Sequence, residues 1–326
     1  MISILNLEPK GYSSEAKAIL RTVGKVENGP LTRDQLIQRI PKYDAIIVRL
    51  NHQIDKKIID KAKSLKLISS ATTGLNHIDT EYAKEKNINV ISLKGNTEFL
   101  EGIYATAEHT WALILALIRN IPQAVNSVKE GNWNRDLFKG SELNGKTLGI
   151  IGLGRIGKKV ANYGLAFGMT VIAYSGDKSA PTGGVQMADS LKSVLEKSDI
   201  VSFHLPLSSH TNRMIGKEQF YSMKKGALII NTSRGEIADE DALIDAMKTG
   251  HLGGAALDVI TNETANLNVK KSKIILFAKE NERLFITPHI GGATYESMEK
   301  TEIFMAEKLV NYYKEKLQTR KTNKIN

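Results

Sequence analysis

The chain has 326 residues, a formal net charge of +10 and no cysteine. This length suits two domains, and a content of 41% hydrophobic and 25% charged residues is typical of globular proteins. The absence of cysteine excludes disulfides, thiol catalysis and cysteine metal ligands. The longest apolar run, residues 111–118, is far too short to span a bilayer, and the N-terminus lacks a signal-peptide pattern.

The positive charge comes mostly from lysines scattered along the chain. We interpret it as a solvated surface, with attraction of an anionic substrate and cofactor as the functional alternative. Aromatic and basic residues are not interleaved as they are in proteins that bind single-stranded nucleic acids, so we expect no nucleic-acid partner. We expect a cytoplasmic protein with no membrane partner and no metal.

The first 95 residues alternate short apolar runs with helical patterns. Thr32 and Gln35 have the spacing of a capping box, and Asp79 is placed as an N-cap. This alternation indicates parallel strands joined by crossover helices, and therefore a small α/β domain. The predicted strands are 2–7, 45–48, 67–71 and 88–91, and the predicted helices are 14–22, 32–40, 55–62 and 79–86.

A mostly apolar helix is predicted at residues 105–119, and Pro122 is expected to end or kink it. Apolar residues cover this helix evenly, which indicates burial. A partner subunit is one candidate for the surface that buries this helix.

A glycine-rich loop at residues 152–157 lies between a predicted strand, 147–151, and a helical pattern that runs to about residue 167. A second strand at 170–174 completes a unit of the size that binds dinucleotides. Gly152 permits a tight turn, Gly154 lets a pyrophosphate approach the backbone, and Gly157 lets helix and strand pack closely. The backbone N–H groups and the helix dipole would then face the phosphates.

Four more strands are predicted after this unit, so we expect six strands in the second domain. The last helix, 295–316, has no strand after it and is interpreted as returning to the first domain. The expected fold class is α/β, with two Rossmann-like or flavodoxin-like domains, doubly wound parallel sheets and a discontinuous substrate domain. Its expected parts are a substrate domain of residues 1–100 with 293–326, and an NAD(P)-binding domain of residues 101–292. The further predicted strands are 200–203, 227–231, 254–257 and 284–287, and the helices between them are 191–197, 217–223 and 239–248.

Three loops follow strands of the second domain and carry Arg234, Glu263 and His289. Ligands bind beyond the carboxyl ends of strands in open α/β sheets, so these side chains are expected in one crevice. An arginine can hold a substrate carboxylate, a histidine can take a hydroxyl proton near neutral pH, and an acid can orient the imidazole. Each residue alone also suits an ordinary loop position, but together they suit oxidation of a 2-hydroxy acid.

Several motifs occur in one order along most of the chain: ATTGLNHID at 71–79, ATAEHT at 105–110, the glycine loop, HLP at 204–206, NTSRG at 231–235, ALDV at 256–259 with Glu263, and TPHIGGATYES at 287–297. In these motifs the chain resembles the D-isomer-specific 2-hydroxyacid dehydrogenases, a family that includes phosphoglycerate dehydrogenase and the hydroxypyruvate and glyoxylate reductases. The resemblance implies a homodimer built largely on helix 105–119.

The resemblance also implies roles for individual residues. Arg234 would hold the carboxylate and the reacting oxygen, His289 would be the acid/base, and Glu263 its partner. Asp258 would hold the nicotinamide carboxamide. Substrate contacts are implied for Thr73, Gly74 and Leu75, and for Arg49, which suits a surface position equally well. The remaining residues implied at the cofactor are Arg155, Ile156, Ser175, His204, Pro206, Thr211, Thr232, Ser233, Gly291 and Gly292.

Two positions depart from the family pattern. Ser175 stands where NAD-preferring members carry an acid, with Asp177 and Lys178 just after it. We expect NAD, with NADP as the alternative, because no arginine is present to bind a 2′-phosphate. Thr264 stands where a proline commonly follows the glutamate.

The chain is therefore expected to interconvert a small anionic D-2-hydroxy acid and its 2-oxo acid. Arg49 and the positive charge favour 3-phosphoglycerate and 3-phosphohydroxypyruvate weakly. The alternatives are a hydroxypyruvate or glyoxylate reductase, and a non-catalytic NAD(H)-sensing binding protein of the same fold.

Overall fold

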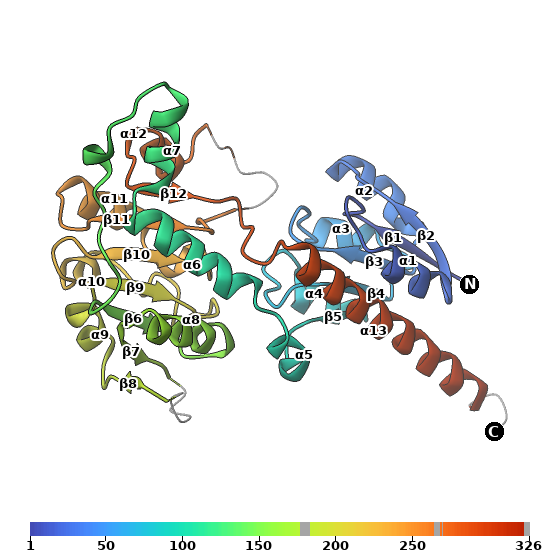
Figure 1. Ribbon diagram of the computed structural model, residues 1–326. Helices are drawn as coiled ribbons and strands as arrows, with labels where there is room; N and C mark the ends of the chain where they lie inside the picture. Colours follow the sequence, from blue (N-terminus) through green and yellow to red (C-terminus); the bar gives the residue numbers. More distant parts are fainter. Residues whose placement is uncertain (177–182, 264–267, 269, 323–326) are drawn as a thin grey trace. The chain divides into compact units, whose positions relative to one another are not determined.

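The computed structural model describes residues 1–176, 183–263, 268 and 270–322, with the side chains of the last helix described to residue 316. The described part of the chain divides into two compact units: unit 1 combines residues 1–102 with 294–322, and unit 2 combines residues 103–263 with 268–293. Each unit is a parallel sheet between layers of helices (Figure 1). The predicted α/β class with two doubly wound sheets is confirmed.

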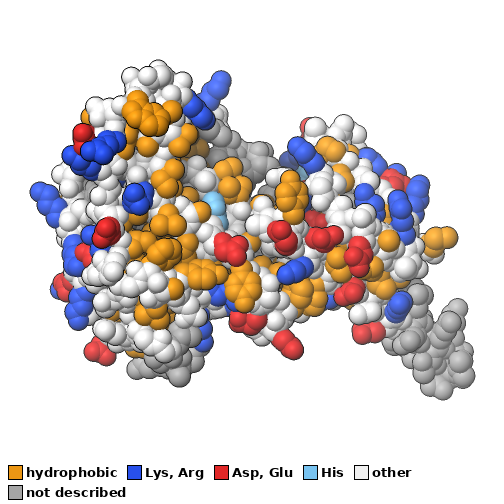
Figure 2. Space-filling model, viewed as in Figure 1, with side chains coloured by type: hydrophobic (Ala, Val, Ile, Leu, Met, Phe, Trp, Pro, Cys, Tyr) orange, Lys and Arg blue, Asp and Glu red, His pale blue; other side chains and the backbone are white. Residues whose placement is uncertain are grey.

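Charged side chains on the face shown in Figure 2 are dispersed, with Lys and Arg lying singly or in small groups among acidic and apolar ones. This distribution favours the interpretation of the lysines as a solvated surface. In the described part of the chain, no helix is both long enough and apolar enough to cross a membrane.

Unit 1 has a five-stranded sheet in the flavodoxin-like order β2-β1-β3-β4-β5. One face is covered by α1 (Ser14–Arg21) and by α13 (Tyr295–Thr322), whose Leu309 packs in a cluster with Ile4 and Leu20. The other face is covered by α2 (Arg33–Arg39), α3 (Lys56–Lys61) and α4 (Thr80–Glu85). The strands are β1 (Ile2–Asn6), β2 (Gly24–Asn28), β3 (Ala45–Val48), β4 (Leu67–Ser70) and β5 (Asn89–Ser92); η1 (Ile40–Lys42) and α5 (Thr97–Glu101) complete the unit.

The helix starts of unit 1 follow the capping signals in the sequence. Thr32 and Gln35 form the reciprocal bonds of a capping box, and the Asp79 carboxylate accepts from Tyr82 N. These bonds satisfy N–H groups that have no partner within the helix.

Unit 2 has a seven-stranded sheet in the order β12-β11-β10-β9-β6-β7-β8. Starting from β6, this is the Rossmann order with one strand added beyond the sixth. The prediction of six strands is therefore wrong. The strands are β6 (Thr147–Ile151), β7 (Thr170–Tyr174), β8 (Val185–Met187), β9 (Ile200–Phe203), β10 (Leu228–Asn231), β11 (Gly254–Leu257) and β12 (Leu284–Ile286).

The two omitted strands, β2 and β8, lie at sheet edges. Their residues are mostly half-buried or exposed, so they lack the apolar pattern by which strands are recognised. Pairing with β1 and β7 holds them in place.

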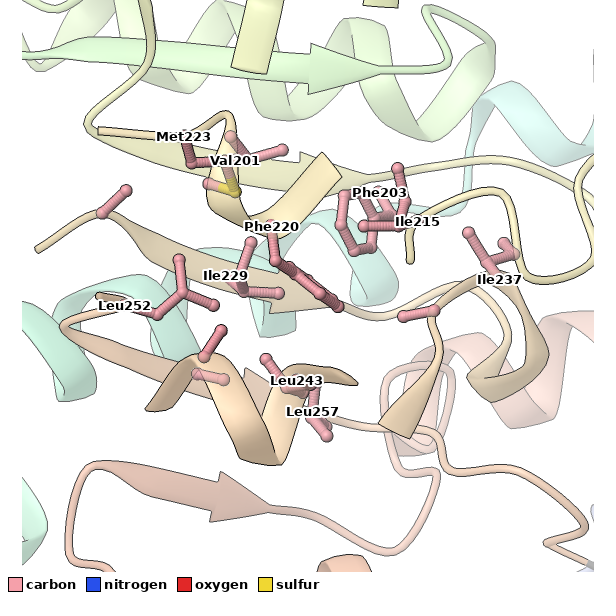
Figure 3. Close-up of a cluster of buried hydrophobic side chains, with 14 of the residues drawn as sticks. Val201, Phe203, Ile215, Phe220, Met223, Ile229, Ile237, Leu243, Leu252 and Leu257 are labelled. Carbon is pink, nitrogen blue, oxygen red and sulfur yellow. The ribbon is translucent and has the colours of Figure 1, made fainter. Parts of the chain in front are cut away.

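Helices cover both faces of the unit 2 sheet. On one face, Val201, Phe203 and Ile229 from β9 and β10 point toward Phe220 of α10 and Leu243 of α11 (Figure 3). The other face packs on α6 and α8, with Trp111 and Val160 in one cluster. The helices of unit 2 are α6 (Ala105–Ile118), α7 (Ile121–Lys129), η2 (Arg135–Phe138), α8 (Arg155–Ala166), α9 (Leu191–Lys197), α10 (Lys217–Tyr221), η3 (Gly235–Ile237), α11 (Glu240–Lys248) and α12 (Lys273–Glu280).

The end of α6 lies within one residue of the prediction, but the role of Pro122 differs from the expected one. The helix stops at Ile118, and Asn120 adopts a left-handed conformation before α7 begins. Pro122 lies in the first turn of α7, where a missing N–H costs nothing, so it starts a helix here and does not kink one. The apolar side chains of α6 are covered within unit 2 itself.

Candidate active site

The glycine loop follows β6 and leads into α8. Gly152 has a φ of +98°, and a Cβ atom there would lie 2.5 Å from the His204 carbonyl oxygen. A Cβ atom on Gly157 would lie 2.1 Å from the Gly152 carbonyl oxygen. At Gly154, the N-cap of α8, a Cβ atom would meet no heavy atom within 4 Å. Gly152 and Gly157 are thus required by the fold, whereas Gly154 leaves open space at a helix N-terminus, where a phosphate would fit.

Other residues expected at the cofactor lie at the start of α8 and after β7 and β9, the two strands that flank β6. Arg155 Nη1 donates to the Ile103 carbonyl at 3.2 Å, and Ile156 packs on the adjoining core. Ser175 is half-buried directly after β7. After β9, the Thr211 hydroxyl donates to the Pro206 carbonyl at 2.7 Å and thereby closes the turn.

His204 lies at the end of β9 and shares a hydrogen bond of 2.9 Å between its Nε2 and the Ser202 hydroxyl. Burial lowers the pKa of His204 from 6.5 to about 3. The ring is therefore neutral at physiological pH.

The loop after β10 is shaped by Asn231. Its Oδ1 accepts from Ser233 N at 3.0 Å and from Ser233 Oγ at 2.8 Å, and its Nδ2 donates to the Arg234 carbonyl at 2.9 Å. The neighbouring Thr232 hydroxyl bonds that of Thr110 at 2.8 Å. No role for Asn231 was predicted, although a polar residue at the end of an apolar strand was a signal that the sequence offered.

Arg234 extends from this loop with its Nη1 donating to the Ser233 carbonyl at 2.5 Å. Within the described ranges, no carboxylate forms an ion pair with Arg234. Arg234 is half-buried, and its guanidinium offers N–H donors in a planar fork that suits an anionic ligand.

Asp258, almost completely buried after β11, organises the loop after β12. Its carboxylate accepts from the Thr287 hydroxyl at 2.6 Å and from the N–H groups of Ile290 and Gly291 at 2.8 and 2.7 Å, and His109 Nε2 lies 3.3 Å from Oδ1. Burial acts to raise the pKa of Asp258, but these hydrogen bonds outweigh it and hold the pKa below its ordinary value. Thr287 and His109 are functional candidates to which the sequence analysis assigned no role.

His289 sits in that loop with a φ of +53°, and its N–H donates to the Asp258 carbonyl at 2.9 Å. Its Nδ1 lies 2.5 Å from Glu263 Oε1, and both side chains are about one quarter exposed. Nε2 therefore remains as the ring nitrogen that can exchange a proton with a ligand. Gly291 follows, where a Cβ atom would lie 2.9 Å from Asp258 Oδ2, whereas Gly292 is in open space.

Contacts of the backbone hold the three loops next to one another. The strands β10, β11 and β12 are neighbours and parallel, so their carboxyl ends share one edge of the sheet. A Cβ atom on Gly235 would lie 2.0 Å from the Ile260 carbonyl carbon, which shows how closely the first two loops pack. The bonds from Asp258 to residues 289–291 join the second loop to the third.

In unit 1, Arg49 directly follows β3, and its Nη1 donates to Glu302 Oε1 at 2.9 Å. Thr73 and Gly74 follow β4 in a turn held by the Thr72 hydroxyl, which donates to the Gly74 carbonyl at 2.7 Å. Leu75 packs against the core of the unit.

Three predicted features lie outside the described residues: Asp177, Lys178 and Thr264. Among the residues that are described, no group of three His, Asp or Glu side chains is placed to hold a metal ion.

The fold and the glycine loop define unit 2 as a dinucleotide-binding α/β domain with a guanidinium, an imidazole and carboxylates at its ligand edge. Residues 111–291 match the family model described as D-isomer specific 2-hydroxyacid dehydrogenase, NAD binding domain. The chain belongs to the D-isomer-specific 2-hydroxyacid dehydrogenase family, as the motifs predicted.

Two proteins with named activities are similar to most of this chain. The chain is 38% identical to a D-3-phosphoglycerate dehydrogenase of Methanocaldococcus jannaschii over 95% of this chain and 57% of that protein. It is 37% identical to a hydroxypyruvate reductase of Thermotoga maritima over 87% of this chain and 90% of that protein. The chain thus spans little more than half the length of the archaeal relative.

A solved structure has the same fold. D-lactate dehydrogenase from Aquifex aeolicus, complexed with NAD and lactic acid, superposes with a TM-score of 0.83 and 30% identity, covering 98% of each chain.

Proposed function

We propose that the protein is an NAD-dependent oxidoreductase that interconverts a small D-2-hydroxy acid and its 2-oxo acid. The observation that carries this proposal is the 2.5 Å pair of His289 and Glu263, held beside a loop whose Arg234 has no carboxylate partner in the described structure. An acid/base and an anion-binding group at one edge of a dinucleotide domain are what this reaction needs.

Each side chain has one role in the proposal. Arg234 binds the substrate carboxylate and polarises the reacting oxygen with its fork of N–H donors. His289 accepts the hydroxyl proton at Nε2 in the oxidising direction and returns it in the reducing direction. Glu263 accepts a hydrogen bond from Nδ1, which fixes the orientation of the imidazole ring and leaves Nε2 for the substrate. Bound NAD supplies the acceptor and donor of hydride.

The residues proposed to hold NAD lie in the glycine loop and in loops that follow other strands of the same parallel sheet. Gly154 offers the open approach to the phosphates, and Asp258 contributes a fixed carboxylate to the adjoining loop. Ser175 carries no charge that would repel a 2′-phosphate, so NADP stays the alternative cofactor. The other proposed cofactor residues are Gly152, Arg155, Ile156, Gly157, His204, Pro206, Thr211, Thr232, Ser233, Gly291 and Gly292.

Unit 1 is proposed as the substrate-binding domain, with Thr73, Gly74 and Leu75 in the loop that receives an anion. We also propose a homodimer. Large apolar side chains are exposed on and after α7, among them Trp133 and Leu137, at 90% and 70%. A second copy would remove such side chains from water. Cytoplasmic localisation stays a prediction.

The proposal is tested with the purified chain by following NADH and NADPH oxidation with pyruvate, glyoxylate, hydroxypyruvate and phosphohydroxypyruvate. We expect turnover of at least one 2-oxo acid, faster with NADH. His289→Ala should lower kcat by about 100- to 10,000-fold, because a positioned acid/base contributes that much. NADH affinity, measured by fluorescence titration, should stay unchanged in this variant. NADH binding without turnover of any acid would contradict the proposal and favour a nucleotide-sensing protein.

A further inference from the structure

Arg49, the arginine at the ligand edge of unit 1, is bound by two acidic side chains of the same unit. Its Nη1 lies 2.9 Å from Glu302 Oε1, and its Nε lies 3.7 Å from Glu8 Oε2. The Arg49 side chain is 19% exposed, that of Glu302 only 1%. This arrangement differs from that of Arg234, which has no such partner among the described residues.

Both carboxylates are anchored by further bonds. Glu302 Oε2 accepts from Ser13 N at 2.6 Å, so both oxygens of this buried acid are in use. Glu8 Oε1 accepts from the N–H groups of Arg49 and Asn51 at 2.7 and 3.2 Å. Turning the guanidinium away would leave the Glu302 charge buried without its partner, which proteins disfavour strongly.

With both carboxylates ionised around one guanidinium, the cluster carries a net negative charge. Burial raises the pKa of Glu302, and the Ser13 N–H and the guanidinium act against that rise by stabilising the ionised form. The neighbouring His52 does not restore the balance, since burial lowers its pKa despite the opposing effect of Glu8. Tyr12 contacts the same cluster, and its pKa is raised by burial and by Glu302, so it stays neutral. A ligand group bearing two negative charges would be repelled here.

We infer that unit 1 selects against a second anionic group, so that the substrate is a 2-oxo acid whose side chain carries no phosphate and no further carboxylate. This inference rests on the proposed function and on the general rule that ligands bind beyond the carboxyl ends of parallel strands. Glu8 and Arg49 follow β1 and β3, which are neighbours in the sheet. The remaining N–H donors of Arg49 suit an uncharged hydroxyl or carbonyl group.

The test compares kcat/KM for hydroxypyruvate and phosphohydroxypyruvate, which differ by the phosphate alone. We expect the wild type to favour hydroxypyruvate by at least about tenfold. This is the effect of the repulsion between one negative charge of the phosphate and one negative charge of the protein about 10 Å away, at an effective dielectric constant of about 20. Glu302→Gln keeps the shape and one of the two acceptor oxygens but removes one negative charge. It should shift the ratio toward phosphohydroxypyruvate by about tenfold.

Glu307→Gln is the matched control, because it removes an exposed charge from the same helix. It should leave the ratio unchanged. Glu8→Gln serves as the second variant if Glu302→Gln does not fold, and its expected shift has the same direction.

Binding is measured in parallel by calorimetry, with D-glycerate and D-3-phosphoglycerate added to the protein in the presence of NAD. Tighter binding of D-glycerate supports the inference even if no acid is turned over. The absence of turnover would overturn the proposed function but not the inference. A preference of the wild type for the phosphorylated compound in either assay overturns the inference. So does an unchanged ratio in both glutamine variants.

Discussion

Gly152 and Gly154 are two residues apart, yet glycine is needed at each for a different reason. Gly152 has a positive φ and a backbone oxygen where its Cβ atom would be, so the fold itself excludes a side chain. Gly154 has neither constraint. Glycine at this position is explained by a ligand: in the dinucleotide-binding motif, the second glycine lets the pyrophosphate approach the backbone.

Gly154→Ala should therefore leave the fold intact and weaken cofactor binding. We expect the free energy of unfolding to fall by about 0.5–1 kcal/mol, since alanine is a poorer N-cap than glycine. The dissociation constant for NADH should rise at least about tenfold, because a methyl group would occupy the phosphate approach. Chemical denaturation and fluorescence titration measure the two quantities. Gly216→Ala, also at an N-cap with space for a Cβ atom, is the control: it should lower stability by a similar amount and leave the dissociation constant unchanged.

His204 should make stability depend on pH between 7 and 5.5. Its pKa falls from 6.5 to about 3 on folding, so below pH 6.5 the unfolded chain takes up a proton that the folded chain does not. Stability from this residue is therefore present above pH 6.5 and is lost as the pH falls toward 3.

Urea unfolding followed by circular dichroism measures this effect. The wild type should lose about 1 kcal/mol more than His204→Gln between pH 7 and pH 5.5. Parallel losses in the two proteins would show that His204 titrates normally in the folded state.

At the scale of elements, α6 shows how a helix with apolar residues on all sides is buried. Trp111 is 5% exposed, donates from Nε1 to the Val160 carbonyl at 3.1 Å and stacks on Phe167 with ring centroids 4.7 Å apart. It thus fastens α6 to α8, the helix that begins at the glycine loop.

Trp111→Ala should lower the free energy of unfolding by about 3–5 kcal/mol, the range for a large aromatic residue removed from a core. Tyr295→Ala removes an aromatic side chain that is 93% exposed and should change stability by less than about 0.5 kcal/mol. The comparison is made by chemical denaturation. Similar small losses in the two variants would mean that α6 is not fastened through Trp111.

At the scale of the whole molecule, the expected homodimer can be tested through the exposed apolar residues of unit 2. Light scattering after gel filtration should give twice the chain mass of 36.0 kDa. Replacing Trp133 and Leu137 together by Asp should yield the monomer, since charges are depleted from the centres of such interfaces. Leu276→Asp, at an exposed apolar position on α12, should keep the dimer. A monomeric wild type at micromolar concentration would exclude the homodimer.

Much of the fold follows from local patterns. The alternation of apolar runs predicts β3 to the residue, and capping signals predict the starts of α2 and α4. Short edge strands such as β8 escape this reasoning, because pairing with a neighbour stabilises them without an apolar face of their own. The end of α6 depends on one left-handed residue, Asn120, a conformation that the apolar pattern does not encode.

The sequence by itself determined the family, the glycine loop and the strand ends from which Arg234, Glu263 and His289 extend, because these depend on residues close together in the chain. Only the tertiary structure decided which charged side chains pair with one another. It placed His109 and Thr287 on Asp258, and it paired Arg49 with Glu302, 253 positions away. Ion pairs form between side chains that packing brings together, and their partners are not encoded in local spacing. The two arginines expected to bind substrate therefore differ: Arg234 has no carboxylate partner in the described structure, and Arg49 has two.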